Sequence, residues 1–120
     1  MSKQFALIIE DEPDLATIFS EALKTAGFET KIIADGQVAL NELETTTPDV
    51  VVLDLHLPRV SGRDILEQIR ADDRFAQTHV LIATADASMA EILEDKADLV
   101  LLKPISFMQL QVLAERFLTS

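Results

Sequence analysis

Acidic, hydroxyl and cationic side chains stand at the ends of four apolar runs in the sequence. Oxygen ligands, with no histidine or cysteine in the set, suit Mg²⁺, and a carboxylate is also a nucleophile that can form an acyl phosphate. A lysine beside them would neutralise charge on a transferring phosphoryl group, and a threonine would donate a hydrogen bond to it. Together these residue types predict a site for an anionic group beside a metal ion. They are Glu10, Asp11, Asp54, Thr84 and Lys103.

The central acid follows the strongest strand signal in the chain. Residues 50–53 are all aliphatic and lead straight into Asp54. A continuous apolar run predicts a strand buried on both faces, as in parallel sheets. Pro58 and Gly62 then end the regular structure. Asp54 is therefore expected at the carboxyl end of a central strand, where ligands bind in open α/β sheets.

Strand-like runs alternate with segments of helical periodicity along the whole chain. Pro13 marks the start and Gly27 the end of the first helix, and Asp35 is expected to cap the second. A short helix is expected after the fourth strand. This strict alternation predicts an α/β fold with a parallel sheet, helices on both faces and right-handed crossovers. The predicted strands are 5–9, 30–34, 50–54, 80–84 and 99–102.

The helical spacing also predicts which side chains face the sheet. The apolar residues with this spacing, helix by helix, are Leu15, Ile18, Phe19, Ala22 and Leu23; Val38, Leu40 and Leu43; Ile65, Leu66 and Ile69; Met89, Ile92 and Leu93; and Leu110, Leu113, Ala114 and Phe117.

If the first and third strands are neighbours at the switch point of the sheet, three carboxylates converge there. Glu10, Asp11 and Asp54 would then repel one another, and the repulsion would raise their pKa values unless a cation intervened.

Composition narrows the range of functions. The 120 residues suit one domain, and the hydrophobic fraction of 48% supports a core. The absence of cysteine excludes disulfides and thiol catalysis. A net charge of −11 argues against direct nucleic-acid binding, and no apolar run approaches membrane-spanning length. We therefore expect a cytoplasmic protein with one domain over residues 1–120, either stand-alone or cut from a longer chain.

Four motifs in a fixed order resemble the receiver domain of two-component response regulators. They are IIEDEP at 8–13, DLHLPRVSG at 54–62, ATA at 83–85 and LLKP at 101–104. The resemblance spans essentially the whole chain. It implies a flavodoxin-like, doubly wound (βα)5 fold like that of the chemotaxis receivers, with a five-stranded parallel sheet of order 2-1-3-4-5.

The resemblance also implies a role for each matching residue around a Mg²⁺ cofactor. Asp54 would be the phosphoacceptor and, with Asp11, a direct metal ligand. Glu10 would act on the metal through water, and the backbone carbonyl of His56 would complete the coordination.

A second group of positions would bind the phosphoryl group and report its arrival. Thr84 would bond the phosphoryl group and swing inward, and Lys103 would pair with Asp54 or its phosphate. The family usually has an aromatic residue three positions before the lysine, and here that position is Val100. We further hypothesise that His56 and Asp86 shape the access of water to the phosphate.

The family relationship implies partners as well as chemistry. A histidine kinase or a phosphotransfer protein would donate the phosphoryl group, and the output partner is unknown. The protein would catalyse only its own phosphorylation and slow dephosphorylation, so it is not expected to be a turnover enzyme. A homodimer through helix four, strand five and helix five is one candidate assembly. Phe107, Met108 and Val112 extend the apolar surface of helix five, either for packing or for an interface.

Other functional classes fit less well. An aspartyl phosphatase typically has a second Asp two residues after its nucleophile, where this chain has His56. Residues 10–12 are all acidic and would repel a flavin phosphate, and no dinucleotide-binding or P-loop motif occurs. A receiver that acts as a phosphorylation-independent interaction or dimerisation module stays open, because of Val100 and the short fourth helix.

Overall fold

The computed structural model describes residues 3–118, so the first two and last two residues of the expected domain lie outside the described part. Strands and helices alternate through the described residues as the sequence predicts. They are β1 (Phe5–Ile9), α1 (Pro13–Ala26), β2 (Glu29–Ile33), α2 (Gly36–Thr45), β3 (Val50–Asp54), α3 (Gly62–Ala71), β4 (His79–Thr84), α4 (Ala87–Leu93), β5 (Leu99–Leu102) and α5 (Phe107–Glu115), with short 3-10 helices at Asp73–Phe75 and Glu94–Lys96.

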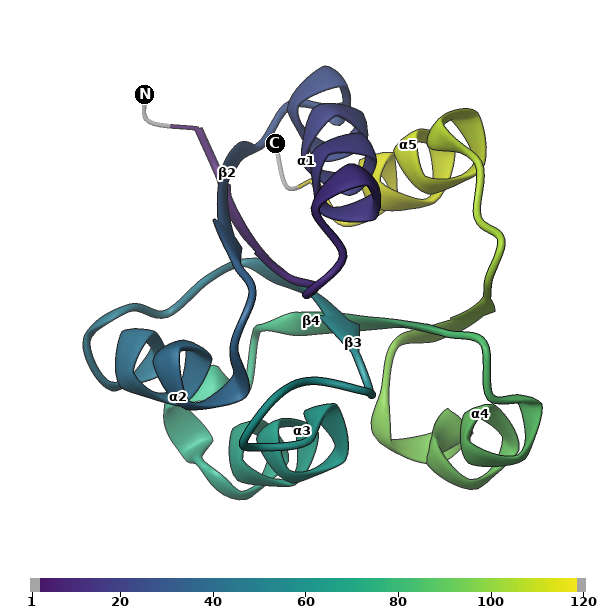
Figure 1. Ribbon diagram of the computed structural model, residues 1–120. Helices are drawn as coiled ribbons and strands as arrows, with labels where there is room; N and C mark the ends of the chain where they lie inside the picture. Colours follow the sequence, from purple (N-terminus) through teal and green to yellow (C-terminus); the bar gives the residue numbers. More distant parts are fainter. Residues whose placement is uncertain (1–2, 119–120) are drawn as a thin grey trace.

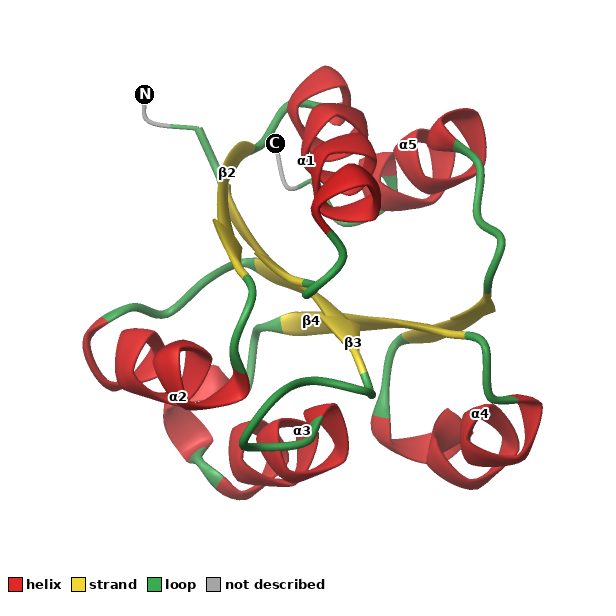
Figure 2. Ribbon diagram, viewed as in Figure 1, coloured by secondary structure: helices red, strands yellow, loops and turns green. Residues whose placement is uncertain are grey.

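The strands form one parallel sheet in the order β2-β1-β3-β4-β5, which confirms the predicted topology. Helices α1 and α5 cover one face, and α2, α3 and α4 cover the other (Figure 1). The order reverses between β1 and β3, so their carboxyl ends lie side by side at the switch point. Figure 2 shows the loops that leave these strand ends.

The central strand is buried along its whole length, as its aliphatic run predicts. All five residues of β3 are buried. Because successive side chains point to opposite faces, Val51 and Leu53 join the core under α2 and α3, whereas Val50 and Val52 join the core under α1 and α5. The two cores hold the strand ends in fixed positions.

Local signals set the helix boundaries. Pro13 begins α1, and Gly27 ends it at φ 119° with its N–H donating to the carbonyls of Leu23 and Lys24. Asp35 caps α2 by accepting from the N–H groups of Gln37 and Val38. These three predictions are confirmed.

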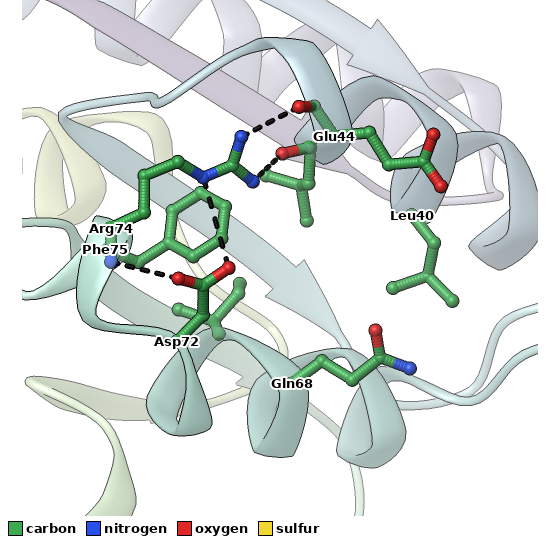
Figure 3. Close-up of a pocket in the computed structure, with 8 residues that line it drawn as sticks. Leu40, Glu44, Gln68, Asp72, Arg74 and Phe75 are labelled. Atoms are coloured by element: carbon green, nitrogen blue, oxygen red, sulfur yellow. Dashed lines mark hydrogen bonds and ion pairs between the residues drawn. The ribbon is translucent and has the colours of Figure 1, made fainter.

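The carboxyl end of α2 has no glycine and is closed by a distant arginine instead. Arg74 donates to the carbonyl oxygens of Leu43 and Glu44, the second at 2.7 Å (Figure 3). Its guanidinium lies 4.4 Å from the centre of the Phe75 ring. A small cavity of about 120 Å³ opens beside it, between α2 and α3. Arg74 thus binds carbonyls that the helix itself leaves unpaired.

Some predicted details are wrong. Strand β2 begins and ends one residue earlier than predicted, and β4 begins one residue earlier, at His79. Ile18, Val38 and Ile92 are 40%, 45% and 60% exposed, although their spacing predicted inward positions. They lie at the margin of the apolar stripe of each helix, where periodicity does not separate partial from full burial. Ile65 and Leu110 are buried as predicted.

No helix within residues 3–118 is both long enough and apolar enough to span a membrane.

Candidate functional site

The side chains predicted to do chemistry meet at the carboxyl edge of the sheet. Asp54 is the last residue of β3, and Glu10 directly follows β1. Lys103 follows β5 and reaches back across the edge. Its Nζ lies 2.9 Å from Glu10 Oε1 and 3.6 Å from Asp54 Oδ1. The structure therefore brings the predicted acids and lysine together, although the lysine lies closer to Glu10 than to Asp54.

Three carboxylates in this cluster fit a divalent cation. Glu10, Asp11 and Asp54 each offer an oxygen, and these oxygens lie within 4.8 Å of one another. Glu10 and Asp54 are buried, while Asp11 faces solvent. Despite the short distance to Lys103, Glu10 Oε1 has no hydrogen-bond partner of acceptable geometry within the described residues. A buried carboxylate oxygen without a hydrogen bond, beside two others, is a donor set that suits a hard cation.

Burial and neighbouring charges shift the pKa values of Glu10 and Lys103. The pKa of Glu10 is raised to about 6, first because burial disfavours the carboxylate and further because Asp54 is negatively charged, with Lys103 acting in the opposite direction. For Lys103, burial would lower the pKa, but the contact with Glu10 and the charge of Asp54 outweigh it, so the pKa is raised. The predicted mutual repulsion is thus real at Glu10 but secondary to burial.

The loop after β3 is held tightly against Asp54. The N–H of His56 donates to Asp54 Oδ1 at 3.2 Å. The N–H of Gly62 donates to the carbonyl of Leu55, and a Cβ at Gly62 would lie 2.0 Å from the carbonyl oxygen of Asp54. Only glycine allows α3 to begin so close to the end of β3.

A second contact ties the same loop to α2, and sequence reasoning missed it. Arg59 adopts φ 67°, and Val60 N–H donates to the carbonyl of Pro58 across it, which makes a tight three-residue turn. Arg59 Nε donates to Asp35 Oδ2 at 2.7 Å. A Cβ at Gly36 would lie 1.9 Å from the Val60 carbonyl oxygen. The sequence does not show that a residue other than glycine adopts a positive φ. It therefore predicts the cap at Asp35 but not the contact between Asp35 and Arg59.

Thr84 lies at the site but faces the loop that follows it. It is fully buried, and its Oγ accepts from the Asp86 N–H at 3.0 Å. The Asp86 carboxylate caps α4 through the N–H of Met89 and lies 4.0 Å from His56 Nε2. Val100 packs at the edge of the core under α4.

Asp98 forms a polar cluster that the sequence did not reveal. Its carboxylate accepts from the N–H of Val80 at 2.7 Å and from Arg70 at 2.9 Å, and it lies 3.2 Å from His79 Nδ1. The His79 ring in turn packs against Phe117. No motif signals this cluster, because its members come from three distant parts of the chain.

The fold is a doubly wound parallel sheet, and an acidic cluster and a lysine lie at its switch point. These features define a class of protein, the small α/β domains that have a flavodoxin-like fold and bind a phosphoryl group at the edge of the sheet. Comparison with known families is more specific. Residues 6–115 match the model of the response regulator receiver domain. The chain belongs to this family and is a receiver domain of the two-component response regulators.

The curated relatives of this chain include mycobacterial regulators. The sensory transduction protein RegX3 of Mycolicibacterium smegmatis is 38% identical over 106 residues, which cover 87% of this chain and 46% of that protein. The DNA-binding response regulator MtrA of the same organism is 34% identical over 105 residues, covering 85% of this chain and 45% of that protein. The chain therefore spans about half the length of the curated relatives it matches.

Solved structures show the same fold. A CheY-like receiver domain from Methylobacillus flagellatus has a TM-score of 0.85 and 29% identity, covering 98% of this chain and all (100%) of that one. The receiver domain of a sensor histidine kinase of Pseudomonas aeruginosa has a TM-score of 0.84 and 26% identity, covering 97% of this chain and 98% of that one. The latter structure has a magnesium ion coordinated in its active-site cleft.

Proposed function

We propose that Asp54 accepts a phosphoryl group from a phosphohistidine and so switches a protein-interaction surface. The observation that supports this most strongly is the convergence of three acids from the ends of β1 and β3 with Lys103 from the end of β5. If Asp54 served only to end β3, the structure would not require two further acids and a lysine beside it.

In the proposed transfer, an oxygen of Asp54 attacks the phosphorus atom while the bond from phosphorus to the imidazole nitrogen breaks. Asp54 Oδ1 already accepts from the His56 N–H and faces Lys103. Oδ2 has no hydrogen bond within residues 3–118, so we assign it as the attacking atom. The electron pair of the broken bond stays on that nitrogen. With a proton on the other nitrogen of the ring, the products are an acyl phosphate and a neutral imidazole. Lys103 would move from Glu10 toward the new phosphoryl oxygens and partly neutralise them.

Asp11 and Asp54 would bind Mg²⁺ directly, with Glu10 acting through water and the His56 carbonyl completing the set. Bound Mg²⁺ would supply positive charge beside the transferring group. The mutual proximity of the three carboxylates, two of them buried, supports this assignment. So does the magnesium ion in the related kinase receiver.

Thr84 and Val100 bear on how the signal leaves the site. Thr84 Oγ accepts from the Asp86 N–H, so a move toward the phosphoryl group would exchange that bond for a new one. Val100 has no ring to fill the space that Thr84 leaves. We therefore propose that the loop between Thr84 and α4 carries the change, and not a paired aromatic side chain.

We further propose one receiver domain over residues 1–120 in a cytoplasmic protein that receives its phosphoryl group from a histidine kinase or a phosphotransfer protein. It would catalyse its own phosphorylation and slow hydrolysis, without turnover of another substrate. The relatives include DNA-binding regulators, and any nucleic-acid contact would belong to parts of such proteins beyond the receiver. A homodimer through α4, β5 and α5 is a second candidate for the output state, supported by the exposed Met108 and Val112.

A magnesium titration followed by NMR tests this proposal. We expect saturable shifts at the amides of Asp11, Asp54 and His56, and an affinity at least about tenfold weaker in Asp11→Asn. Asp14→Asn, in the first turn of α1, removes the same charge nearby and should bind like the wild type. Equal affinities in the two variants would contradict the assignment.

A further inference from the structure

Two loops that leave the acidic edge of the sheet are tied to each other. The first joins β2 to α2, and the second joins β3 to α3. Asp35 of the first loop accepts from Arg59 Nε of the second at 2.7 Å. Gly36 N–H donates to the carbonyl of Pro58 at 3.2 Å, and a Cβ at Gly36 would lie 1.9 Å from the Val60 carbonyl oxygen. The loops are therefore in close backbone contact, and one ion pair closes that contact.

Each loop also contacts a residue of the proposed metal site. At the end of β2, the carbonyl of Ile33 accepts from the N–H of Glu10 at 3.1 Å. At the end of β3, the N–H of His56 donates to Asp54 Oδ1 at 3.2 Å. Only a few residues of backbone separate each of these hydrogen bonds from the ion pair. A change at the ion pair would therefore reach the acidic cluster through short stretches of chain.

The backbone at Arg59 is strained. Among residues 3–118 it is the one residue other than glycine with a positive φ, of 67°. Such a conformation persists only where neighbouring contacts hold it, and it is concentrated at functional sites. The Arg59 side chain is 67% exposed, so its ion pair adds little to the free energy of unfolding, and a glycine would relax the turn. Stability alone therefore does not account for an arginine at this position.

We propose that Arg59 is a positioning residue for Mg²⁺ binding and acts through its ion pair with Asp35. The pair holds the loop after β3 against the start of α2. It thereby fixes the stretch of backbone that carries His56, whose carbonyl is a proposed metal ligand. Without the pair, the metal would have to order this loop on binding, which lowers the affinity. The inference deepens the proposed function and rests on its assignment of the metal ligands.

Positioning and simple electrostatics predict opposite effects when the charge of Arg59 is removed. A cation near the metal site repels Mg²⁺, so the loss of its charge alone would tighten Mg²⁺ binding. The loss of a positioning contact would instead weaken Mg²⁺ binding. The direction of the change in affinity therefore separates the two roles.

Lys31 and Glu42 provide a matched ion pair on the same helix. Lys31 Nζ lies 2.7 Å from Glu42 Oε1, the same distance as in the pair of Arg59 with Asp35. The side-chain exposures are also similar, 54% and 21% against 67% and 20%. The control pair joins β2 to α2 and does not involve the loop after β3. Lys31→Gln therefore removes the same charge without loosening that loop.

A magnesium titration of the full chain, followed by NMR, compares the variants. Arg59→Gln keeps a side chain on the strained backbone and should weaken Mg²⁺ binding about three- to fivefold. Lys31→Gln should bind Mg²⁺ as tightly as the wild type or slightly more tightly. Arg59→Lys keeps the positive charge and should recover part of the lost affinity.

A double-mutant cycle tests whether Arg59 acts through Asp35. Asp35→Asn preserves the cap on α2, because asparagine is also a good N-cap residue, and it removes the charge that Arg59 contacts. It should weaken Mg²⁺ binding, and Asp35→Asn/Arg59→Gln should bind no more weakly than the weaker single variant. If the two residues acted only through their charges, the double variant would bind like the wild type.

Hydrogen exchange without metal tests the positioning independently of the metal assignment. The amides of Gly36 and Val60 both donate to the Pro58 carbonyl. In Arg59→Gln they should exchange with solvent at least about threefold faster than in the wild type. The amides of β3 should keep their wild-type rates, which would show that the fold is intact.

Three results would overturn the inference: Mg²⁺ binding in Arg59→Gln that equals or exceeds that of the wild type, equal weakening in Lys31→Gln, or unchanged exchange at Gly36 and Val60. Asp11→Asn separates this failure from that of the proposed function. Weakened binding in Asp11→Asn with wild-type binding in Arg59→Gln would overturn this inference alone. Equal affinities in Asp11→Asn and the wild type would reject the metal site and this inference with it.

Discussion

Lys103 Nζ lies 2.9 Å from Glu10 Oε1, closer than the 3.6 Å that separates it from Asp54 Oδ1. In this state the lysine therefore compensates a buried acid that is not the one it is proposed to serve in catalysis. Arrival of a metal ion and a phosphoryl group would redistribute these charges. The positive charge of Lys103 thus stabilises the buried carboxylates of the site before a metal ion or a phosphoryl group binds.

The first prediction concerns the loss of that compensation. Lys103→Met leaves Glu10 and Asp54 buried without their cation, so the free energy of unfolding should fall by about 3 kcal/mol. Lys96→Met breaks an exposed pair with Glu67 and should cost less than about 1 kcal/mol. Urea denaturation without divalent ions measures both. Equal losses would show that Lys103 is an ordinary surface lysine.

The second prediction follows from the raised pKa of Glu10. Between its ordinary value of 4.5 and about 6, the folded protein holds a proton that the unfolded chain has released. The contribution to stability is therefore fully present below about pH 4.5 and is lost as the pH rises through about 6, by at most about 2 kcal/mol. Glu10→Gln should remove this part of the pH dependence in metal-free denaturation. If the free energies of unfolding of wild type and Glu10→Gln differ by the same amount at every pH from 4.5 to 6, the raised pKa of Glu10 would be refuted.

A third prediction concerns the tight turn at Arg59. Both substitutions lose the ion pair with Asp35, but at φ 67° a glycine is relaxed whereas an alanine keeps the backbone strain. Arg59→Gly should therefore be more stable than Arg59→Ala, by about 1 kcal/mol. In α3, Arg63 provides the control with the reverse order, because alanine is preferred in a helix. Thermal unfolding of the four variants decides the matter.

The fourth prediction concerns the lifetime of the phosphate. His56 and Asp86 stand 4.0 Å apart beside the site, both partly or fully exposed. Removing the ring in His56→Ala should admit water and shorten the lifetime of the acyl phosphate about two- to fivefold. His79→Ala removes a histidine remote from the site and should leave the lifetime unaltered. An unchanged lifetime in His56→Ala would end the water-access hypothesis.

Much of the fold could be predicted from the sequence, because its strongest signals are periodic and local. The five-residue strand ending in Asp54, the stop at Gly27 and the cap at Asp35 each depend on neighbouring residues alone. The site could be predicted because parallel strands place their carboxyl ends on one edge. The order of the strands came from the family resemblance.

The remaining features depend on contacts between distant segments. Arg74 closes α2 from 30 residues away, and Asp98 joins Arg70 across 28. Lys103 lies closer to Glu10 than to Asp54 because of the conformation of its side chain within the buried cluster. The spacing of these residues in the sequence does not predict that conformation. Exposure at Ile92 depends on how completely a short helix covers an edge strand. Tertiary packing decides each of these.

The central claim is that Asp54 is the phosphoacceptor, and mass spectrometry tests it most directly. The wild-type chain, incubated with Mg²⁺ and a small phosphodonor such as acetyl phosphate, should gain one phosphoryl group. That group should be absent from Asp54→Asn and retained in Asp64→Asn, an exposed aspartate in the first turn of α3. Labelling of Asp54→Asn to the same extent as the wild type would contradict the account.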